Sequence, residues 1–139
     1  MRIAAFASLL ALTVAAPALA EPAASIRFDF ETGAATGKIM VALYDTAEAY
    51  SGGAPVRQAQ VDVANGQTRA DFGDLPAGDY AMKAFHDVNG NGRMDTNPFG
   101  MPTEPFAFSN NARGNMGPAS WDRARFSVSG EVAQTVAIR

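Results

Sequence analysis

The sequence predicts an all-β protein, a single antiparallel β-sandwich of about seven strands and of the immunoglobulin or prealbumin type, with one long ordered loop. Three observations predict this fold. Apolar and polar residues alternate over several short runs, turn residues separate the runs, and no stretch sustains a helical period. In a sandwich each strand buries one face against the opposite sheet, so period-two alternation is typical of this class.

Residues 1–20 have the organisation of a secretory signal peptide. A basic residue, Arg2, precedes an apolar run, and Ala-Leu-Ala at 18–20 supplies the small residues of a cleavage site. We therefore expect export to the periplasm or to the outside of the cell. The remaining residues, 21–139, are expected to form one β-sandwich domain, because this length suffices to bury a sizeable core.

Composition excludes several classes of function. Removing the leader takes away one basic residue and no acidic one, which leaves a formal net charge of −4 with the histidine neutral. A chain without a basic stripe is not expected to bind nucleic acid. The mature part has no apolar run of the roughly 20 residues that a transmembrane helix needs. The absence of cysteine excludes thiolate catalysis and zinc-thiolate or iron–sulfur sites.

The first half of the mature chain contains four expected strands, at residues 25–31, 38–44, 56–63 and from the turn at 64–67 through 72. In the first of them, Ile26, Phe28 and Phe30 alternate with charged residues and therefore share one buried face. Asn65-Gly66 tolerates positive φ at both positions, which predicts a two-residue hairpin between the third and fourth strands.

Three further strands are expected at residues 79–86, 123–128 and 132–138, the first of them after turn residues at 73–78. Between them lies an aperiodic segment, 87–121, that is rich in Gly, Asn and Pro. The backbone groups of so long a loop must find partners within the domain. We therefore expect a ligand or local packing to order it.

The start of this loop has the spacing of a calcium-binding loop. Oxygen-bearing side chains occupy its positions 1, 3, 5 and 9, which are Asp87, Asn89, Asn91 and Asp95. Gly92 at position 6 allows a sharp turn, and Arg93 at position 7 offers its carbonyl oxygen. This pattern predicts a structural Ca²⁺ of weak affinity, about 10⁻⁴ to 10⁻³ M.

The predicted shell is short of oxygens. Calcium takes roughly six to eight ligands, and position 12, where an EF-hand has its bidentate Glu, is Pro98. The loop is thus no EF-hand, and Glu104 or Asn97 is needed to complete the shell. The alternative is that the Asp, Asn and Gly residues form consecutive Asx-turns without an ion.

His86 is the only histidine, and alternation places it on the same face as Tyr80, Met82 and Ala84. We expect a structural histidine that hydrogen-bonds to the long loop. An enzyme centred on His86, with an acid or with Ser109 or Ser120 as nucleophile, is the alternative.

Four aromatic residues fall in the long loop: Phe99, Phe106, Phe108 and Trp121. They either pack the loop onto a sheet as a second core or form an exposed patch. The second possibility predicts a metal-independent module that binds a protein or a glycan.

The residues around the predicted calcium loop resemble an exported bacterial family of unknown function, numbered 2141. The resemblance rests on His86-Asp87-x-Asn89-x-Asn91-Gly92-x-x-Asp95-x-Asn97, Gly100-x-Pro102-x-Glu104 and Phe108-Ser109-Asn110-Asn111. It implies an exported β-sandwich with no established activity. The sequence therefore favours a non-catalytic module with a calcium-stabilised loop, and it leaves the partner and the oligomeric state open.

Overall fold

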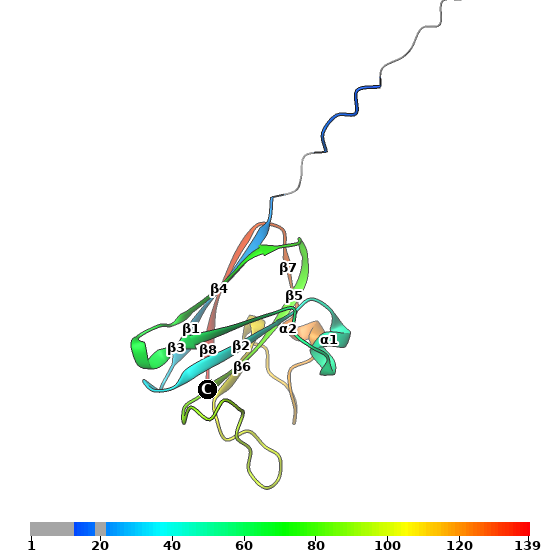
Figure 1. Cartoon of the computed structure of the whole chain (residues 1–139). Coiled ribbons are helices and arrows are strands. Elements are labelled where there is room, and N and C mark those ends of the chain that lie inside the picture. Colours follow the sequence, from blue (N-terminus) through cyan, green and yellow to red (C-terminus); the bar gives the residue numbers. More distant parts are fainter. Residues whose placement is uncertain (1–12, 19–21) are drawn as a thin grey trace, which may run out of the picture.

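The computed structural model describes residues 13–18 and 22–139, whose main body consists of two β-sheets (Figure 1). The predicted cleavage site after Ala20 and most of the predicted leader lie outside these residues. The first sheet has the order β4-β1-β8, formed by Arg69–Leu75, Ala24–Thr32 and Glu131–Ile138. The second has the order β3-β2-β5-β6, formed by Arg57–Asp62, Lys38–Tyr44, Gly78–Asp87 and Phe106–Phe108. A short strand, β7 (Phe126–Val128), also pairs with β5.

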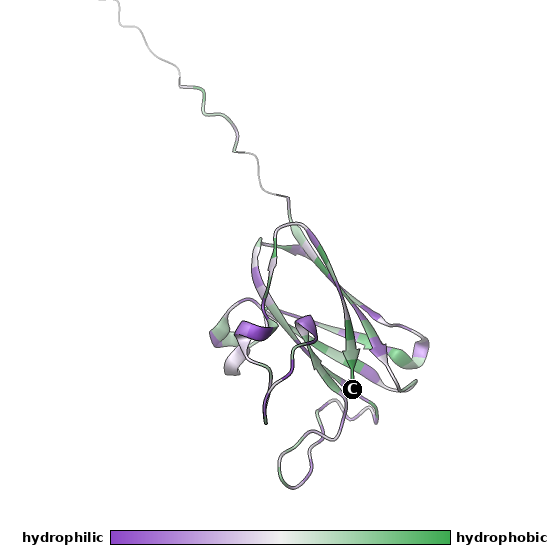
Figure 2. Ribbon diagram, turned by 180° about the vertical axis from the view of Figure 1, so that it is seen from behind, coloured by the Kyte–Doolittle hydropathy of each residue, from purple (hydrophilic) through white to green (hydrophobic). Residues whose placement is uncertain are grey.

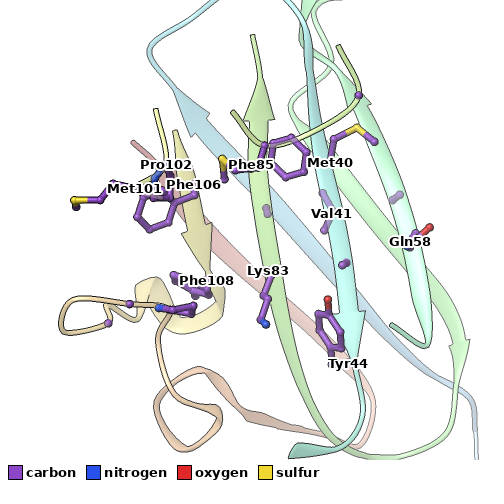
Figure 3. A pocket seen from close by; sticks show the side chains of 18 of the residues that line it. Met40, Val41, Tyr44, Gln58, Lys83, Phe85, Met101, Pro102, Phe106 and Phe108 are labelled. Carbon is purple, nitrogen blue, oxygen red and sulfur yellow. The ribbon is translucent and has the colours of Figure 1, made fainter. Parts of the chain in front are cut away.

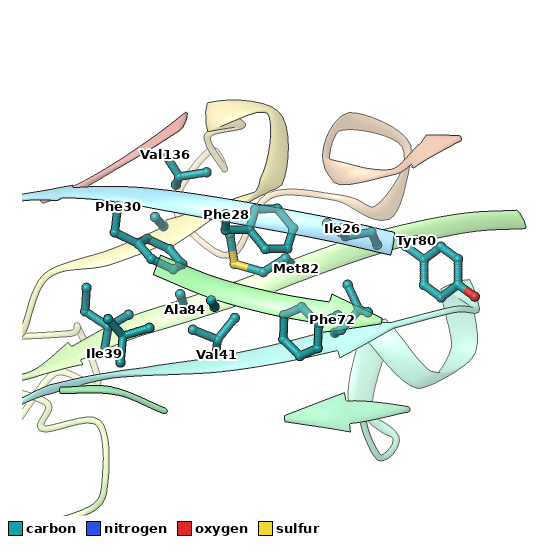
Figure 4. Close-up of a cluster of buried hydrophobic side chains, with 14 of the residues drawn as sticks. Ile26, Phe28, Phe30, Ile39, Val41, Phe72, Tyr80, Met82, Ala84 and Val136 are labelled. Carbon is teal, nitrogen blue, oxygen red and sulfur yellow. The ribbon is translucent and has the colours of Figure 1, made fainter. Parts of the chain in front are cut away.

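The buried side chains of both sheets form one apolar cluster (Figure 4). Phe28 of β1 is at its centre, with its ring centroid 6.3 Å from that of Phe72 and 6.0 Å from that of Phe126. Ile39 of β2 and Met82 of β5 are buried in the same cluster, opposite β1. Both sheets thus present the apolar face that their alternation predicts, and the hydropathy colouring of the ribbon shows that alternation along the strands (Figure 2).

Several predicted strands are confirmed almost to the residue. β2 begins and ends where alternation predicts, and β1, β5 and β8 differ from the expected bounds by one or two residues at most. Ile26, Phe28 and Phe30 are buried on one face of β1, as predicted. The coarse all-β expectation with two sheets therefore holds.

The predicted antiparallel pairing holds for every strand pair of the described residues except one. β1 pairs with β8 in parallel, in an unbroken register from Ser25 opposite Glu131 to Thr32 opposite Ile138. Parallel neighbours require a crossover connection. Here that connection is all the chain between β1 and β8, which includes the entire second sheet.

The predicted hairpin at Asn65-Gly66 is wrong. β3 pairs with β2 and β4 pairs with β1, so the chain crosses from one sheet to the other at this point. A 3-10 turn, η1 (Val63–Asn65), makes the crossing and ends at Gly66 with φ 83°. The Asp62 carboxylate accepts hydrogen bonds from the backbone N–H and the side-chain amide of Asn65, which favours this turn over a hairpin.

The segment 87–121 is not one uninterrupted loop. The short strand β6 and the 3-10 turn η2 (Ser109–Asn111) divide it into two loops, 88–105 and 112–120. Two short helices were also not predicted: α1 (Ala47–Gly52), and α2 (Trp121–Ala124), which replaces the first half of the strand expected at 123–128. In the described part of the chain, no helix has the length and apolar character needed to cross a membrane.

Candidate functional site

The loop 88–105 extends β5 and returns to β6 at one end of the molecule (Figure 1). His86 N–H donates to the Pro105 carbonyl over 2.8 Å, which closes the base of the loop. Further along, Thr103 N–H donates to the Asp95 carbonyl and Asn97 N–H to the Met101 carbonyl. The loop therefore consists of a wide first half, 87–95, and a narrow second half that folds back as a small hairpin.

Asp87 organises the first half of the loop. Its side chain is nearly buried, with 3% of the residue surface exposed. Its two carboxylate oxygens accept hydrogen bonds from the backbone N–H groups of Asn91 (3.1 Å) and Gly92 (2.8 Å). Gly92 adopts φ 81°, the left-handed conformation that a side chain disfavours. The carboxylate at position 1 thus lies inside the loop that follows it.

Asp95 at position 9 is linked to both asparagines of the loop. Its carboxylate accepts hydrogen bonds from the side-chain amides of Asn89 (2.5 Å) and Asn91 (2.7 Å). The hydrogen bond from Asn91, and to a smaller extent that from Asn89, holds the pKa of Asp95 below its ordinary value. The amide oxygens of the asparagines accept from backbone N–H groups, with Asn91 Oδ1 bonded to the N–H of Arg93.

Glu104 returns to the first half of the loop from its second half, 16 residues after Val88 and 9 residues after Asp95. The residue is 8% exposed, and it accepts hydrogen bonds from Val88 N–H and Asp95 N–H, each over 3.2 Å. The structure therefore brings Glu104 to the ends of the predicted calcium loop. Asn97, the other candidate for completing the shell, instead uses its oxygen to accept from Phe99 N–H and Met101 N–H.

The donor set of this cluster is suited to a hard cation, because it consists of carboxylate, amide and carbonyl oxygens. In the conformation described, however, no three carboxylate or histidine side chains among residues 13–18 and 22–139 are close enough to share a metal ion. Asn89 and Asn91 turn their NH₂ groups toward Asp95. To bind a cation on this side, their carboxamide groups would have to rotate by half a turn about the Cβ–Cγ bond and present oxygen instead.

His86 is completely buried and both of its ring nitrogens have partners. Nε2 lies 2.6 Å from the Thr36 carbonyl oxygen, so it carries the proton and donates. Nδ1 lies 2.8 Å from Thr32 Oγ1, and in the neutral ring it accepts from that hydroxyl. The ring connects β5 to the segment between β1 and β2, an arrangement that supports the structural role and not that of a general base.

The residues proposed to assist a catalytic His86 are engaged elsewhere. Ser109 Oγ accepts from Met82 N–H and donates to the Ala124 carbonyl. Asp87 directs its carboxylate into the loop, and Glu104 caps the same loop. Neither Ser109 nor either of these two acids hydrogen-bonds to the His86 ring, whose partners are Thr32 and Thr36.

The four loop aromatics divide between the two expected roles. Phe108 is buried and Trp121 packs beside it, in a second cluster that also contains Tyr50 and Ala81. Phe99, by contrast, is 90% exposed at the tip of the loop, and Phe106 is 39% exposed. The second core and the exposed aromatic surface therefore both exist.

A groove that the sequence reading missed lies on the outer face of the five-stranded sheet (Figure 3). It has a volume of about 1100 Å³, and both loops, 88–105 and 112–120, contribute to its walls. Its lining includes Met40 and Tyr44 of β2 and Lys83 and Phe85 of β5. Met40 and Tyr44 at outward positions of β2 indicated an apolar surface in the sequence, though not a groove, because the outward positions of a strand with only one buried face are normally polar.

One family matches most of this chain. The model of the family described as "Uncharacterized protein conserved in bacteria (DUF2141)" matches residues 31–136. Comparisons with curated proteins and with solved structures gave no match. The matched range contains the whole five-stranded sheet, the loop 88–105, the groove, β4 and most of β8, but only the last two residues of β1.

Proposed function

Because this chain belongs to DUF2141, a family of uncharacterised bacterial proteins, we propose that it is an exported, non-catalytic β-sandwich module with a calcium-stabilised loop. The sandwich is of the immunoglobulin or prealbumin type, and its loop 88–105 is ordered by a structural Ca²⁺. Export rests on the N-terminal leader pattern. The non-catalytic role is supported by His86, whose ring is buried and fully hydrogen-bonded.

The observation that carries the calcium proposal is the linkage of the five predicted side-chain ligands in one hydrogen-bonded cluster. Backbone N–H groups of residues 88, 91, 92 and 95 all donate to carboxylates of that cluster. A loop whose backbone is arranged around acidic oxygens is typical of calcium loops. The loop carries three carboxylates, on Asp87, Asp95 and Glu104, and a divalent cation would neutralise part of this negative charge.

The proposed ligands are the carboxylates of Asp87, Asp95 and Glu104, the amide oxygens of Asn89 and Asn91, and the carbonyl oxygen of Arg93. Water would supply the remaining positions. The bound ion would hold the two halves of the loop together, since Glu104 comes from its second half. The role of the ion would thus be structural, to fix the shape of a surface loop, and not catalytic.

Thermal unfolding tests this proposal. We expect the midpoint of the purified protein to rise in millimolar Ca²⁺ relative to chelator, and to rise little in Mg²⁺, because an ion that binds only the folded state stabilises it. The quantity to compare is the calcium-induced shift, since Asp95→Ala also changes the loop without calcium. Asp95→Ala should abolish the shift, and Asp122→Ala, which removes an exposed acid of α2, should retain it. An unchanged midpoint of the unmodified protein in millimolar Ca²⁺ would refute the proposal.

A second candidate function is a metal-independent binding module that uses the loop tip. Phe99 and Met101 favour it, because they are 90% and 61% exposed and lie close together in the tip. In that case Asp87→Ala and Asp95→Ala would leave folding and loop order intact. Phe99→Ser would then remove binding to a glycan or protein surface.

A further inference from the structure

The groove on the five-stranded sheet is large and mostly apolar. Its volume of about 1100 Å³ slightly exceeds the usual range of small-molecule sites, roughly 300 to 1,000 Å³. Its walls include three methionines from the two loops, Met94, Met101 and Met116. Methionine side chains adapt to ligands of different shape because they are unbranched and polarizable.

The lining changes along the groove (Figure 3). Phe85, Met40 and Phe106 lie toward one end and provide aromatic and thioether surface. Lys83 and Tyr44 lie toward the other end. Among the lining residues, Lys83 is the only one with a charge. The groove thus combines a long apolar part with a single positive group.

The environment of Lys83 leaves that positive charge without a counter-ion. Nζ lies 4.2 Å from the ring centroid of Tyr50 and 5.2 Å from that of Tyr44, and it donates to the Tyr50 carbonyl over 2.5 Å. No carboxylate of the described part of the chain forms an ion pair with it. Burial lowers the pKa of Lys83, which reflects the cost of keeping this charge in partly desolvated surroundings.

We propose that this groove binds a small amphipathic carboxylate, whose apolar body lies against Phe85 and Phe106 and whose carboxylate pairs with the ammonium group of Lys83. An ammonium group has three N–H donors, and the Tyr50 carbonyl takes one of them. The other donors can serve a ligand oxygen. One lysine without a neighbouring arginine suits a monoanion better than a phosphate, which is usually recognised by several donors.

The same features disfavour other small ligands. A cationic amphiphile would place a second positive charge beside Lys83, and the faces of Tyr44 and Tyr50 that attract cations are already occupied by Lys83. A neutral alcohol would gain the apolar contacts but no charge-assisted hydrogen bond. This proposal uses no calcium and stands independently of the function proposed above.

Isothermal titration of the purified protein tests the proposal with three probes of equal chain length: dodecanoate, dodecanol and dodecyltrimethylammonium. The titrations are made below the micelle concentrations and in chelator, because calcium precipitates the carboxylate. We expect dodecanoate to bind about 10- to 100-fold more tightly than dodecanol, the range of one charge-assisted hydrogen bond. The cation should bind most weakly.

Two pairs of variants locate the site. Lys83→Met keeps the length and apolar character of the side chain and should reduce dodecanoate affinity to that of dodecanol. Arg27→Gln, which removes an exposed charge from the other sheet, should leave it unchanged. Phe106→Gln should weaken all three probes several-fold, whereas Phe99→Gln, in the same loop region but outside the groove lining, should not.

Several results would overturn the proposal. Equal affinities for dodecanoate and dodecanol would show that Lys83 recognises no carboxylate, and an absence of binding would exclude the groove as a site for this class. Sensitivity to Phe99→Gln instead of Phe106→Gln would place the ligand at the loop tip. If Lys83→Met does not fold, chemical-shift mapping of dodecanoate on the unmodified protein decides between the groove and other surfaces. None of these outcomes depends on whether calcium raises the unfolding midpoint.

Discussion

The side-chain amide of Asn111 forms hydrogen bonds with the edge of β8 like those that the backbone of a neighbouring strand would form. Its Nδ2 donates to the Thr135 carbonyl and its Oδ1 accepts from Ala137 N–H, each over 2.9 Å. Asn110 makes comparable bonds to Gln134 and to the carbonyls of α2 and its cap. Asn110 and Asn111 therefore attach η2 to β8 through their side chains. Both residues adopt positive φ in this arrangement.

We expect Asn111→Gly to lower the free energy of unfolding by about 1 to 2 kcal/mol, because it leaves two backbone groups of β8 without partners. Glycine tolerates the φ of 50° at this position, so the loss reports the hydrogen bonds and little backbone strain. Urea unfolding measures the change. Asn115→Gly is the matched control, as the Asn115 side chain makes no hydrogen bond among the described residues, and an equal loss in the control would contradict this assignment.

Gly37 has no room for a side chain. It adopts φ 73°, and a Cβ atom would lie 2.0 Å from the carbonyl oxygen of Asp87. We expect Gly37→Ala to cost at least about 2 kcal/mol of stability, since the left-handed conformation and the overlap with backbone both oppose it. Gly33→Ala, in the same connection but with open space around it, should be near neutral in the same urea experiment. Similar values for the two variants would contradict the packing described here.

The two amide hydrogen bonds to Asp95 predict a particular response to acid. Because they hold the folded-state pKa of Asp95 below its unfolded value, their stabilisation is complete above that unfolded value and is lost as pH falls below about 4. Thermal midpoints measured in chelator over this range should fall less steeply for Asp95→Asn than for the unmodified protein. Parallel curves would contradict this account.

At the scale of elements, alternation predicted strands but not their partners. β2 and β5 were predicted correctly because each has a buried face that repeats every second residue. β6 has only three residues, too few for a period to be visible, and it forms because it pairs with Lys83–Phe85 of β5. Pairing across the sheet depends on tertiary structure, so the parallel β1–β8 ladder was beyond a local pattern.

The candidate site was predictable to a similar degree. Spacing alone identified Asp87, Asn89, Asn91 and Asp95, since a loop that wraps a cation needs oxygens at fixed intervals. Glu104 was identified only as a possibility, and its burial against the loop comes from the hairpin that precedes it. The groove could not be located from the sequence, because its lining comes from four strands and two loops that are distant in sequence.

The two loops offer a built-in comparison for limited proteolysis. Arg93 lies exposed in the loop 88–105 and Arg113 lies exposed in the loop 112–120. If calcium orders only the first loop, it should slow tryptic cleavage after Arg93 by roughly tenfold or more and leave cleavage after Arg113 almost unchanged. Mass spectrometry of the fragments with time measures both rates in one sample. Equal protection at both sites would indicate general stabilisation and no local site.

At the scale of the whole molecule, the candidate calcium loop and the groove share residues. Gly92, Met94 and Met101 belong to the loop 88–105 and also line the groove. An ion that fixes this loop should therefore raise the affinity of the groove for a ligand, and the ligand should raise the affinity for the ion by the same factor. An anionic naphthalenesulfonate dye can serve as the groove ligand, because calcium does not precipitate it. The dye is titrated with and without calcium, and calcium is titrated with and without the dye. Independent affinities would show that the loop wall has the same position with and without the ion.

The parallel pairing of β1 with β8 also determines when the molecule can fold. The central strand of the three-stranded sheet comes from the start of the domain, and one of its two neighbours is the last strand of the chain, about a hundred residues later. Contacts so distant in sequence form slowly, and a ribosome-bound chain lacks this neighbour until β8 has emerged. The three-stranded sheet therefore cannot be completed before β8 has been made. Under the export proposed above, this would leave the new polypeptide incompletely folded while it is threaded across a membrane.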